Sequence, residues 1–199
     1  MGYSLTKRLF DIIFGLLSII LCIPFGIIIS ILIKYESKGP VLFYQTRIGK
    51  DGLGFRLYHF RTMYYLTSNE LQQLSNKQEV LSESDRLYRL GFTRIGKFLR
   101  KYSLDELPQL FNVVNGDMSF VGPRPSLPYE YERLDESYKK RTKVKPGLVG
   151  LWLLHGRGEV KYNSMMDLDL NYIENMSFSN DTLILLKSIA ILLRGTGAL

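Results

Sequence analysis

The feature that most constrains this sequence is an uncharged apolar run, Ile12 to Ile33, which covers 22 residues near the N-terminus. As a helix it would be about 33 Å long, enough to cross the hydrocarbon core of a bilayer. The run is longer than the apolar core of a removable signal peptide, and no small-residue cleavage site follows it. The sequence therefore predicts a chain that is held in a membrane.

Pro24 lies in the middle of this run, where its missing N–H and its ring should kink the helix. Both flanks are basic, with Lys7 and Arg8 before the run and Lys34 and Lys38 after it. A straight crossing would place one basic flank on the outer side, against the positive-inside tendency. We expect a re-entrant helix hairpin, hinged at Pro24, that enters and leaves on the same face. A simple spanning helix is the alternative.

Length and charge bound the rest of the protein. The 199 residues suffice for one globular domain with a core, and the formal net charge of +7 favours an anionic partner. We expect a re-entrant membrane helix at 1–38 and a membrane-associated globular domain at 39–199. The expected fold class is α+β and mainly helical, with a small β-hairpin and interfacial amphipathic helices.

Local patterns predict the elements of the second part. Strands at 41–45 and 55–60 flank a glycine-rich turn and should form the β-hairpin. The other expected elements are an exposed helix or loop at 66–87, helices at 93–102, 129–140 and 162–172, and an apolar helix at 182–194. The last is too short to span a bilayer comfortably. We expect it in the membrane interface, with a buried core helix as the alternative.

Two adjacent acids, Asp105 and Glu106, lie at a predicted helix start. Ser103 and Glu106 fit a capping box, which would give Glu106 a structural role. Asp105 is the alternative cap, because Pro108 would then fall in the tolerated first turn. Either cap leaves Asp105 at a helix N-terminus, where a negative charge is stabilised.

Adjacent acids on a helix project about 100° apart and cannot face each other across a sugar, as the acids of a glycosidase do. They suit a nucleophile beside a metal ligand. A carboxylate can attack phosphorus, and Mg²⁺ typically takes one or two carboxylates plus substrate phosphate oxygens.

Arginines surround this pair in the sequence. Arg100 precedes the acids, Arg124 stands between two prolines, and Arg157 follows a glycine. A rigid arginine binds phosphate bidentately at a lower entropic cost. Each arginine alone reads as an ordinary surface residue, but their concentration around one acid pair indicates a phosphate site.

These motifs resemble those of the bacterial sugar transferase family, the small monotopic phosphoglycosyl transferases. The match runs through nearly the whole chain and is most specific in the central stretch 103–125. Its segments are Lys7-Arg8-Leu9-Phe10-Asp11, Gln45-Thr46-Arg47-Ile48-Gly49, Phe60-Arg61-Thr62-Met63, Ser103-Leu104-Asp105-Glu106-Leu107-Pro108-Gln109-Leu110, Gly116-Asp117-Met118-Ser119-Phe120-Val121-Gly122-Pro123-Arg124-Pro125 and Lys145-Pro146-Gly147-Leu148-Val149-Gly150.

The resemblance implies a cytosolic catalytic domain that transfers, with Mg²⁺, a sugar 1-phosphate from a UDP-sugar to a polyprenyl phosphate. Undecaprenyl phosphate is the expected acceptor, and UMP is released. Asp105 would be the nucleophile and Glu106 a ligand of the metal. The implied place is the cytoplasmic face of the bacterial plasma membrane, in contact with its lipids. The sugar and the oligomeric state stay open, a homodimer being one alternative.

The resemblance also implies substrate-binding roles for a set of basic residues: Arg47, Arg61, Arg100, Arg124 and Arg157. His59 stands where the family commonly has a lysine, so it would be a weaker substitute if that position contacts phosphate. Ile23 stands where the family usually has a serine before the hinge proline, which leaves the depth of the bend open.

Two other functions fit the sequence less well. A membrane-tethered scaffold with a decayed site conflicts with the intact acids and arginines. A nucleic-acid binder would rest on charge alone, because no binding module is recognisable. For the chemistry, a single displacement through a ternary complex is the alternative to a covalent intermediate.

Overall fold

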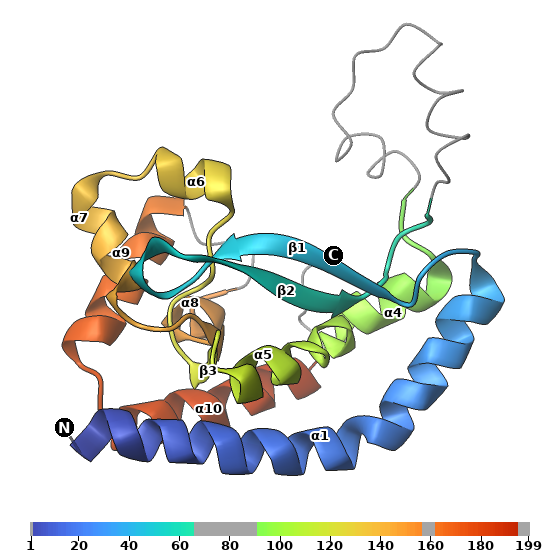
Figure 1. Ribbon diagram of the computed structural model, residues 1–199, viewed down its shortest axis with the longest axis horizontal. Coiled ribbons are helices and arrows are strands. Elements are labelled where there is room, and N and C mark those ends of the chain that lie inside the picture. The colour runs from blue at the N-terminus through green and yellow to red at the C-terminus, as the bar shows by residue number, and fades with distance from the viewer. Residues whose placement is uncertain (1, 66–90, 157–161, 195–199) are drawn as a thin grey trace, which may run out of the picture.

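The computed structural model describes residues 2–65, 91–156 and 162–194. Within them the protein is mainly helical, with two small two-stranded sheets (Figure 1). The segment expected at 66–87 lies outside the described residues, and so does Arg157. The general fold class predicted from the sequence is confirmed.

The N-terminal run forms one long helix, α1 (Gly2–Glu36), with Pro24 inside it. Figure 1 shows α1 running along the base of the molecule and then bending upwards. A proline inside a helix removes one hydrogen bond and crowds the preceding turn, which accounts for a bend. The helix is long and apolar enough to cross a membrane, and most of its side chains are exposed. The re-entrant path through a bilayer stays a prediction.

The predicted β-hairpin is present. Strands β1 (Leu42–Ile48) and β2 (Gly54–Phe60) pair antiparallel around the short 3₁₀ turn η1 (Lys50–Gly52). Asp51 and Gly52 both have positive φ in this turn, which fits the turn chemistry read from the sequence. Leu57 points from the hairpin into a core cluster with Val113 and Met118.

The acid-bearing segment folds as three short helical pieces: α4 (Arg94–Lys101), the 3₁₀ turn η2 (Leu104–Glu106) and α5 (Gln109–Asn115). Thr93 caps α4 by accepting a hydrogen bond from the Gly96 amide at 2.8 Å. Neither predicted cap of the acid pair forms. Ser103 takes a left-handed conformation without a side-chain capping bond, and α5 begins only after Pro108.

A second sheet was not predicted. Strand β3 (Ser119–Val121) pairs in parallel with β4 (Gly147–Val149). The two backbones approach so closely that a Cβ on Gly122 would lie 2.6 Å from the Lys145 carbonyl oxygen, and one on Gly150 would lie 2.4 Å from the Gly122 carbonyl oxygen. Glycines at this crossing are therefore required by packing rather than by flexible turns.

The helix predicted at 129–140 is broken into α6 (Pro128–Glu132), α7 (Glu136–Lys139) and the 3₁₀ turn η3 (Lys140–Lys143). Leu134 turns into the main core between α6 and α7, and Asp135 then adopts an extended backbone, which ends helical continuity. The charged sequence pattern alone did not reveal this buried leucine.

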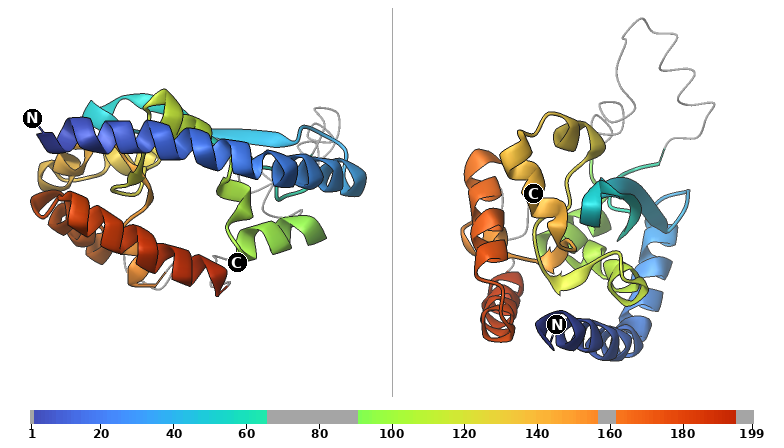
Figure 2. Two further views of the ribbon diagram at one scale, coloured as in Figure 1. Left: turned by 90° about the horizontal axis from the view of Figure 1, so that it is seen from below. Right: turned by 60° about the vertical axis from the view of Figure 1, so that its left-hand side comes forward.

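The C-terminal part contains α8 (Leu151–Leu154), α9 (Tyr162–Glu174) and α10 (Phe178–Leu193). Ile184 and Ser188 of α10 are buried against the domain, whereas Leu183, Leu186 and Leu193 are exposed. Seen from below, α10 and α1 run across the same face of the molecule (Figure 2). An interfacial position of α10 stays a prediction, since one side of the helix is core and the other is exposed and apolar.

Polar contacts fasten both ends of α1 to the domain. At its C-terminal end the Arg61 guanidinium donates to the carbonyls of Ile33, Ser37 and Lys38. The Glu36 carboxylate accepts from the first amides of α4, at 2.6 Å from Arg94 N and 2.9 Å from Ile95 N. The Arg61 contacts hold the chain where it leaves α1, and Glu36 satisfies orphan amides at the start of α4.

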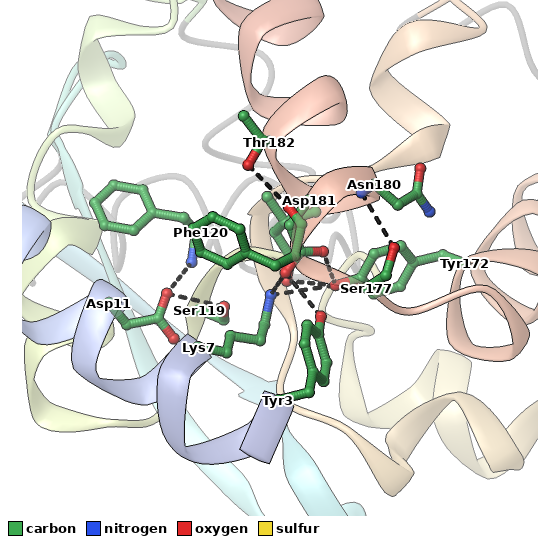
Figure 3. Close-up of polar contacts among 12 residues, drawn as sticks. Tyr3, Lys7, Asp11, Ser119, Phe120, Tyr172, Ser177, Asn180, Asp181 and Thr182 are labelled. Atoms are coloured by element: carbon green, nitrogen blue, oxygen red, sulfur yellow. Dashed lines mark hydrogen bonds and ion pairs between the residues drawn. The ribbon is translucent and has the colours of Figure 1, made fainter.

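Near its N-terminal end α1 is tied to α9 and α10 (Figure 3). The Lys7 ammonium lies 2.5 Å from an Asp181 carboxylate oxygen, and the Tyr3 and Tyr172 hydroxyls donate to the same carboxylate at 2.8 and 2.7 Å. Phe10 adds ring contacts with Phe178. The carboxylate is thus well paired, as a buried charge requires.

Gly96 offers a test of the packing between α4 and the segment after β2. A Cβ at this position would lie 1.8 Å from the Thr62 carbonyl oxygen, so Gly96→Ala must displace the backbone. We expect a loss of several kcal/mol in stability, seen as a clearly lower melting temperature by circular dichroism. Gly54→Ala is the control, because its Cβ would meet only ordinary contacts, the nearest at 3.6 Å.

Candidate active site

The acid pair lies in η2, between the end of α4 and the start of α5 (Figure 1). The left-handed conformation of Ser103 turns the chain into η2. Neighbouring side chains on a helical turn project in different directions, so the two carboxylates do not point the same way. Asp105 is 6% exposed, whereas Glu106 is only partly buried. The two carboxylates therefore occupy different environments although they are neighbours in sequence.

Basic side chains from four different elements gather near Glu106. Arg47 comes from β1, His59 from β2, Arg100 from α4, and Arg124 from the loop after β3. The charges of Glu106, Arg47 and Arg100 all act on His59, and those of Arg124 and Glu106 act on Arg47. The structure thus brings together four of the basic residues singled out in the sequence, with Glu106 among them.

Arg47 is held by two hydrogen bonds, to the Pro125 carbonyl at 3.1 Å and to the Gln45 side-chain oxygen at 2.9 Å. Burial lowers the pKa of Arg47 to about 10, and the neighbouring Arg124 acts in the same direction. It remains a cation at neutral pH. Two guanidinium groups that repel each other in a partly buried place favour a bound anion between or beside them.

His59 is neutral at neutral pH. Burial lowers its pKa to about 4, Arg47 and Arg100 act in the same direction, and Glu106 and the Leu57 carbonyl act against it. Its Nε2 lies 3.0 Å from the Gln109 amide nitrogen. His59 therefore cannot replace the charge of a lysine at this position, and a role in the site would use hydrogen bonding rather than charge.

Arg124 is exposed, with its guanidinium 6.0 Å above the Trp152 ring. Its backbone is held by two buried residues, Arg141 and Asp169. Arg141 donates to the Arg124 carbonyl and to Asp169, and the Asp169 carboxylate accepts from the Arg124 amide at 3.3 Å. Burial raises the pKa of Asp169 to about 6, although Arg141 acts in the opposite direction. This buried pair stiffens the loop that presents Arg124.

Arg61 lies apart from this arrangement in its contacts. It is 6% exposed, and its guanidinium donates to carbonyls at the C-terminal end of α1, as described above. This placement favours a structural role for Arg61, and its predicted contact with substrate stays untested. Arg157 lies outside the described residues.

The sequence pattern did not single out two buried side-chain amides, because they stand among apolar neighbours. Gln109 contacts His59, and Asn112 joins α5 to β2 by donating to the Arg56 carbonyl at 2.7 Å and accepting from the Tyr58 amide at 3.3 Å. Polar residues at buried helix positions, three apart and just after the acid pair, were the available signal.

The residues present suit a magnesium ion that is shared with a substrate. The described part of the chain has no group of three or more acids, histidines or cysteines able to hold a metal ion by itself. Mg²⁺ bound to phosphorylated substrates commonly needs only one or two carboxylates. Glu106, partly exposed and close to the basic residues, provides one such carboxylate.

The pH dependence of stability tests the environment of His59. Its folded pKa lies below that of an unfolded histidine, so the contribution of His59 to stability should fall as the pH drops from about 6.5 towards 4, where only the unfolded chain gains the proton. We expect a loss of up to about 3 kcal/mol across this window. His59→Gln should flatten this part of the melting-temperature profile. His155→Gln, an exposed control, should leave it unchanged.

Comparison with known proteins gives a consistent set of relatives. The family model described as bacterial sugar transferase matches residues 2–195. A galactosyl transferase CpsE of Streptococcus agalactiae is 37% identical over 99% of this chain and 44% of its own length. The UDP-glucose:undecaprenyl-phosphate glucose-1-phosphate transferase of Klebsiella pneumoniae is 39% identical over 92% of this chain and 39% of its own length.

The exopolysaccharide production protein ExoY of Sinorhizobium fredii is 35% identical over 94% of this chain and 84% of its own length. The chain thus spans less than half the length of several curated relatives and most of the length of ExoY.

Proposed function

The chain belongs to the bacterial sugar transferase family, and from this premise we propose that it transfers a sugar 1-phosphate from a UDP-sugar to a polyprenyl phosphate, with release of UMP. Relatives with this activity in their names support the reaction class. The observation that carries the proposal here is the gathering of Arg47, Arg100 and Arg124 in one neighbourhood with Glu106.

In the first step we propose that a carboxylate oxygen of Asp105 attacks the phosphorus that carries the sugar. A bond forms between this oxygen and phosphorus, the phosphoanhydride bond breaks, and UMP leaves with the bonding electrons. Arg47 and Arg124 offset the negative charge of the diphosphate, which otherwise repels a carboxylate nucleophile.

In the second step an oxygen of the polyprenyl phosphate attacks the same phosphorus. The bond to Asp105 breaks, the carboxylate is restored, and a polyprenyl diphosphate sugar is formed. Glu106 would hold Mg²⁺, which when bound would neutralise charge on the phosphate oxygens.

Asp105→Asn tests the nucleophile. Because a carboxamide is a poor nucleophile, we expect UMP release to fall by at least about 10³-fold while the protein stays folded. The matched control is Asp117→Asn, an equally conservative change just beyond α5, which should keep activity within a few-fold. Near-normal turnover of Asp105→Asn would contradict covalent catalysis at this residue.

A trapping experiment separates the two kinetic schemes. When the protein is incubated with a UDP-sugar but no lipid acceptor, the peptide that contains Asp105 should gain the mass of one phosphosugar. If UMP appears only when polyprenyl phosphate is present and no adduct forms, the single displacement through a ternary complex is correct. A panel of UDP-sugars in the same assay would identify the donor.

We also propose that α1 enters and leaves the membrane on the cytoplasmic side, with the catalytic domain on that face. The exposed apolar surface of α1, its bend and its two basic flanks support this arrangement.

The test uses exposed single cysteines, Ser4→Cys and Lys38→Cys, in a Cys22→Ser background. An impermeant maleimide should label both in inside-out vesicles and neither in intact spheroplasts. Labelling of one site in spheroplasts would show that α1 spans the bilayer.

A further inference from the structure

The stretch Lys7-Arg8-Leu9-Phe10-Asp11 has no part in the chemistry proposed above. It lies in the first third of α1, where Leu9 is exposed and the polar members face the domain. Arg8 and Asp11 are three residues apart and so lie on neighbouring parts of one helix face. Each of them contacts a different element of the candidate active site.

Arg8 binds the C-terminal end of α5. Its two terminal guanidinium nitrogens donate to the carbonyls of Val113 and Val114 at 2.8 and 2.7 Å. These carbonyls belong to the last turn of α5, where helix carbonyls lack partners within the helix and a cation is favoured by the helix dipole. The bidentate grip fixes direction as well as distance.

The opposite end of α5 is joined to η2, which carries the acid pair. Backbone bonds from Leu107 N to the Leu104 carbonyl, at 3.3 Å, and from Leu110 N to the Leu107 carbonyl, at 3.1 Å, join η2 to α5 without a gap. At about 1.5 Å per residue, the bonds of Arg8 act about 13 Å from Asp105 through one helical rod.

Asp11 binds the strand that leads to Arg124. Its carboxylate, in a residue that is 2% exposed, accepts from the Ser119 hydroxyl at 3.0 Å and from the Phe120 amide at 3.1 Å (Figure 3). Arg124 follows four residues after Phe120, beyond the close crossing of β3 with β4. One turn of α1 therefore holds both the acid-bearing rod and the arginine-bearing strand.

We propose that Arg8 and Asp11 are positioning residues, which set the acid pair and Arg124 relative to each other by fixing both to the same turn of the membrane helix. This inference rests on the proposed function of the site. It predicts that the seating of α1 in the membrane affects the chemical step as well as the location of the protein.

The first experiment measures steady-state UMP release by the protein in the presence of UDP-sugar and polyprenyl phosphate. Arg8→Met should lower kcat about 10- to 100-fold with the KM for UDP-sugar changed less than about threefold, because misplacement by about 1 Å costs chemistry more than binding. Arg8→Lys, which keeps one charged donor, should recover part of this loss.

Two further variants separate positioning from general anchoring. Asp11→Asn keeps a carbonyl oxygen that can accept both bonds, so it should retain most of the activity, whereas Asp11→Leu should lose it. Lys7→Met breaks the ion pair to Asp181 in α10, which holds no residue of the candidate site. It should lower the melting temperature and leave kcat close to that of the wild type. An equal loss of kcat in Lys7→Met would overturn the proposal.

Hydrogen exchange gives a readout that does not depend on activity. In Arg8→Met the amides of residues 104–116 should exchange faster than in the wild type, whereas in Lys7→Met the faster exchange should be confined to residues 172–185. Unchanged exchange at 104–116 in Arg8→Met would overturn the link between α1 and the acid pair. Absence of UMP release from the wild type would instead overturn the proposed function.

Discussion

The few polar groups of a long apolar helix are the ones that can fix it to a polar domain in a defined orientation. In this protein those groups lie near the two ends of α1, and the contacts there organise the rest of the structure. Arg61 and Glu36 join the C-terminal end to the start of α4, and Lys7, Arg8 and Asp11 join the N-terminal end to α10, α5 and β3. Between them one side of the helix packs against α5 and a cluster with Phe60 and Leu99, and most of the other apolar side chains are exposed.

The candidate site shows how burial redistributes the roles that charge alone would assign. Arg47 and His59 lie on the same face of the hairpin, and burial lowers the pKa of both. Arg47 stays charged because the ordinary pKa of a guanidinium lies far above neutrality. His59 does not, because the ordinary pKa of an imidazole, about 6.5, is already close to neutrality. The local excess of positive charge therefore comes from guanidinium groups, which keep it at every physiological pH. Glu106 is the nearby negative charge that balances part of it.

Much of this arrangement could be predicted from the sequence because the signals were local. The apolar run, the glycine-rich hairpin turn and the adjacent acids each predicted an element or a site from a few neighbouring residues. Long-range features escaped. The parallel pairing of β3 with β4 joins segments about 28 residues apart, and the buried Arg141–Asp169 pair also joins residues 28 positions apart. Arg61 shows the same limit, since its position in a motif did not reveal that it binds the end of α1.

The burial of Asp105 has a consequence for the economy of the proposed reaction. A mixed anhydride between a carboxylate and a phosphate hydrolyses readily, and each such loss would consume one activated sugar without extending a glycan. A residue that is only 6% exposed offers bulk water little access. The fold would then suppress futile turnover during the interval between departure of the nucleotide and arrival of the slowly diffusing lipid. Such protection would suit the proposed nucleophile in so enclosed a place.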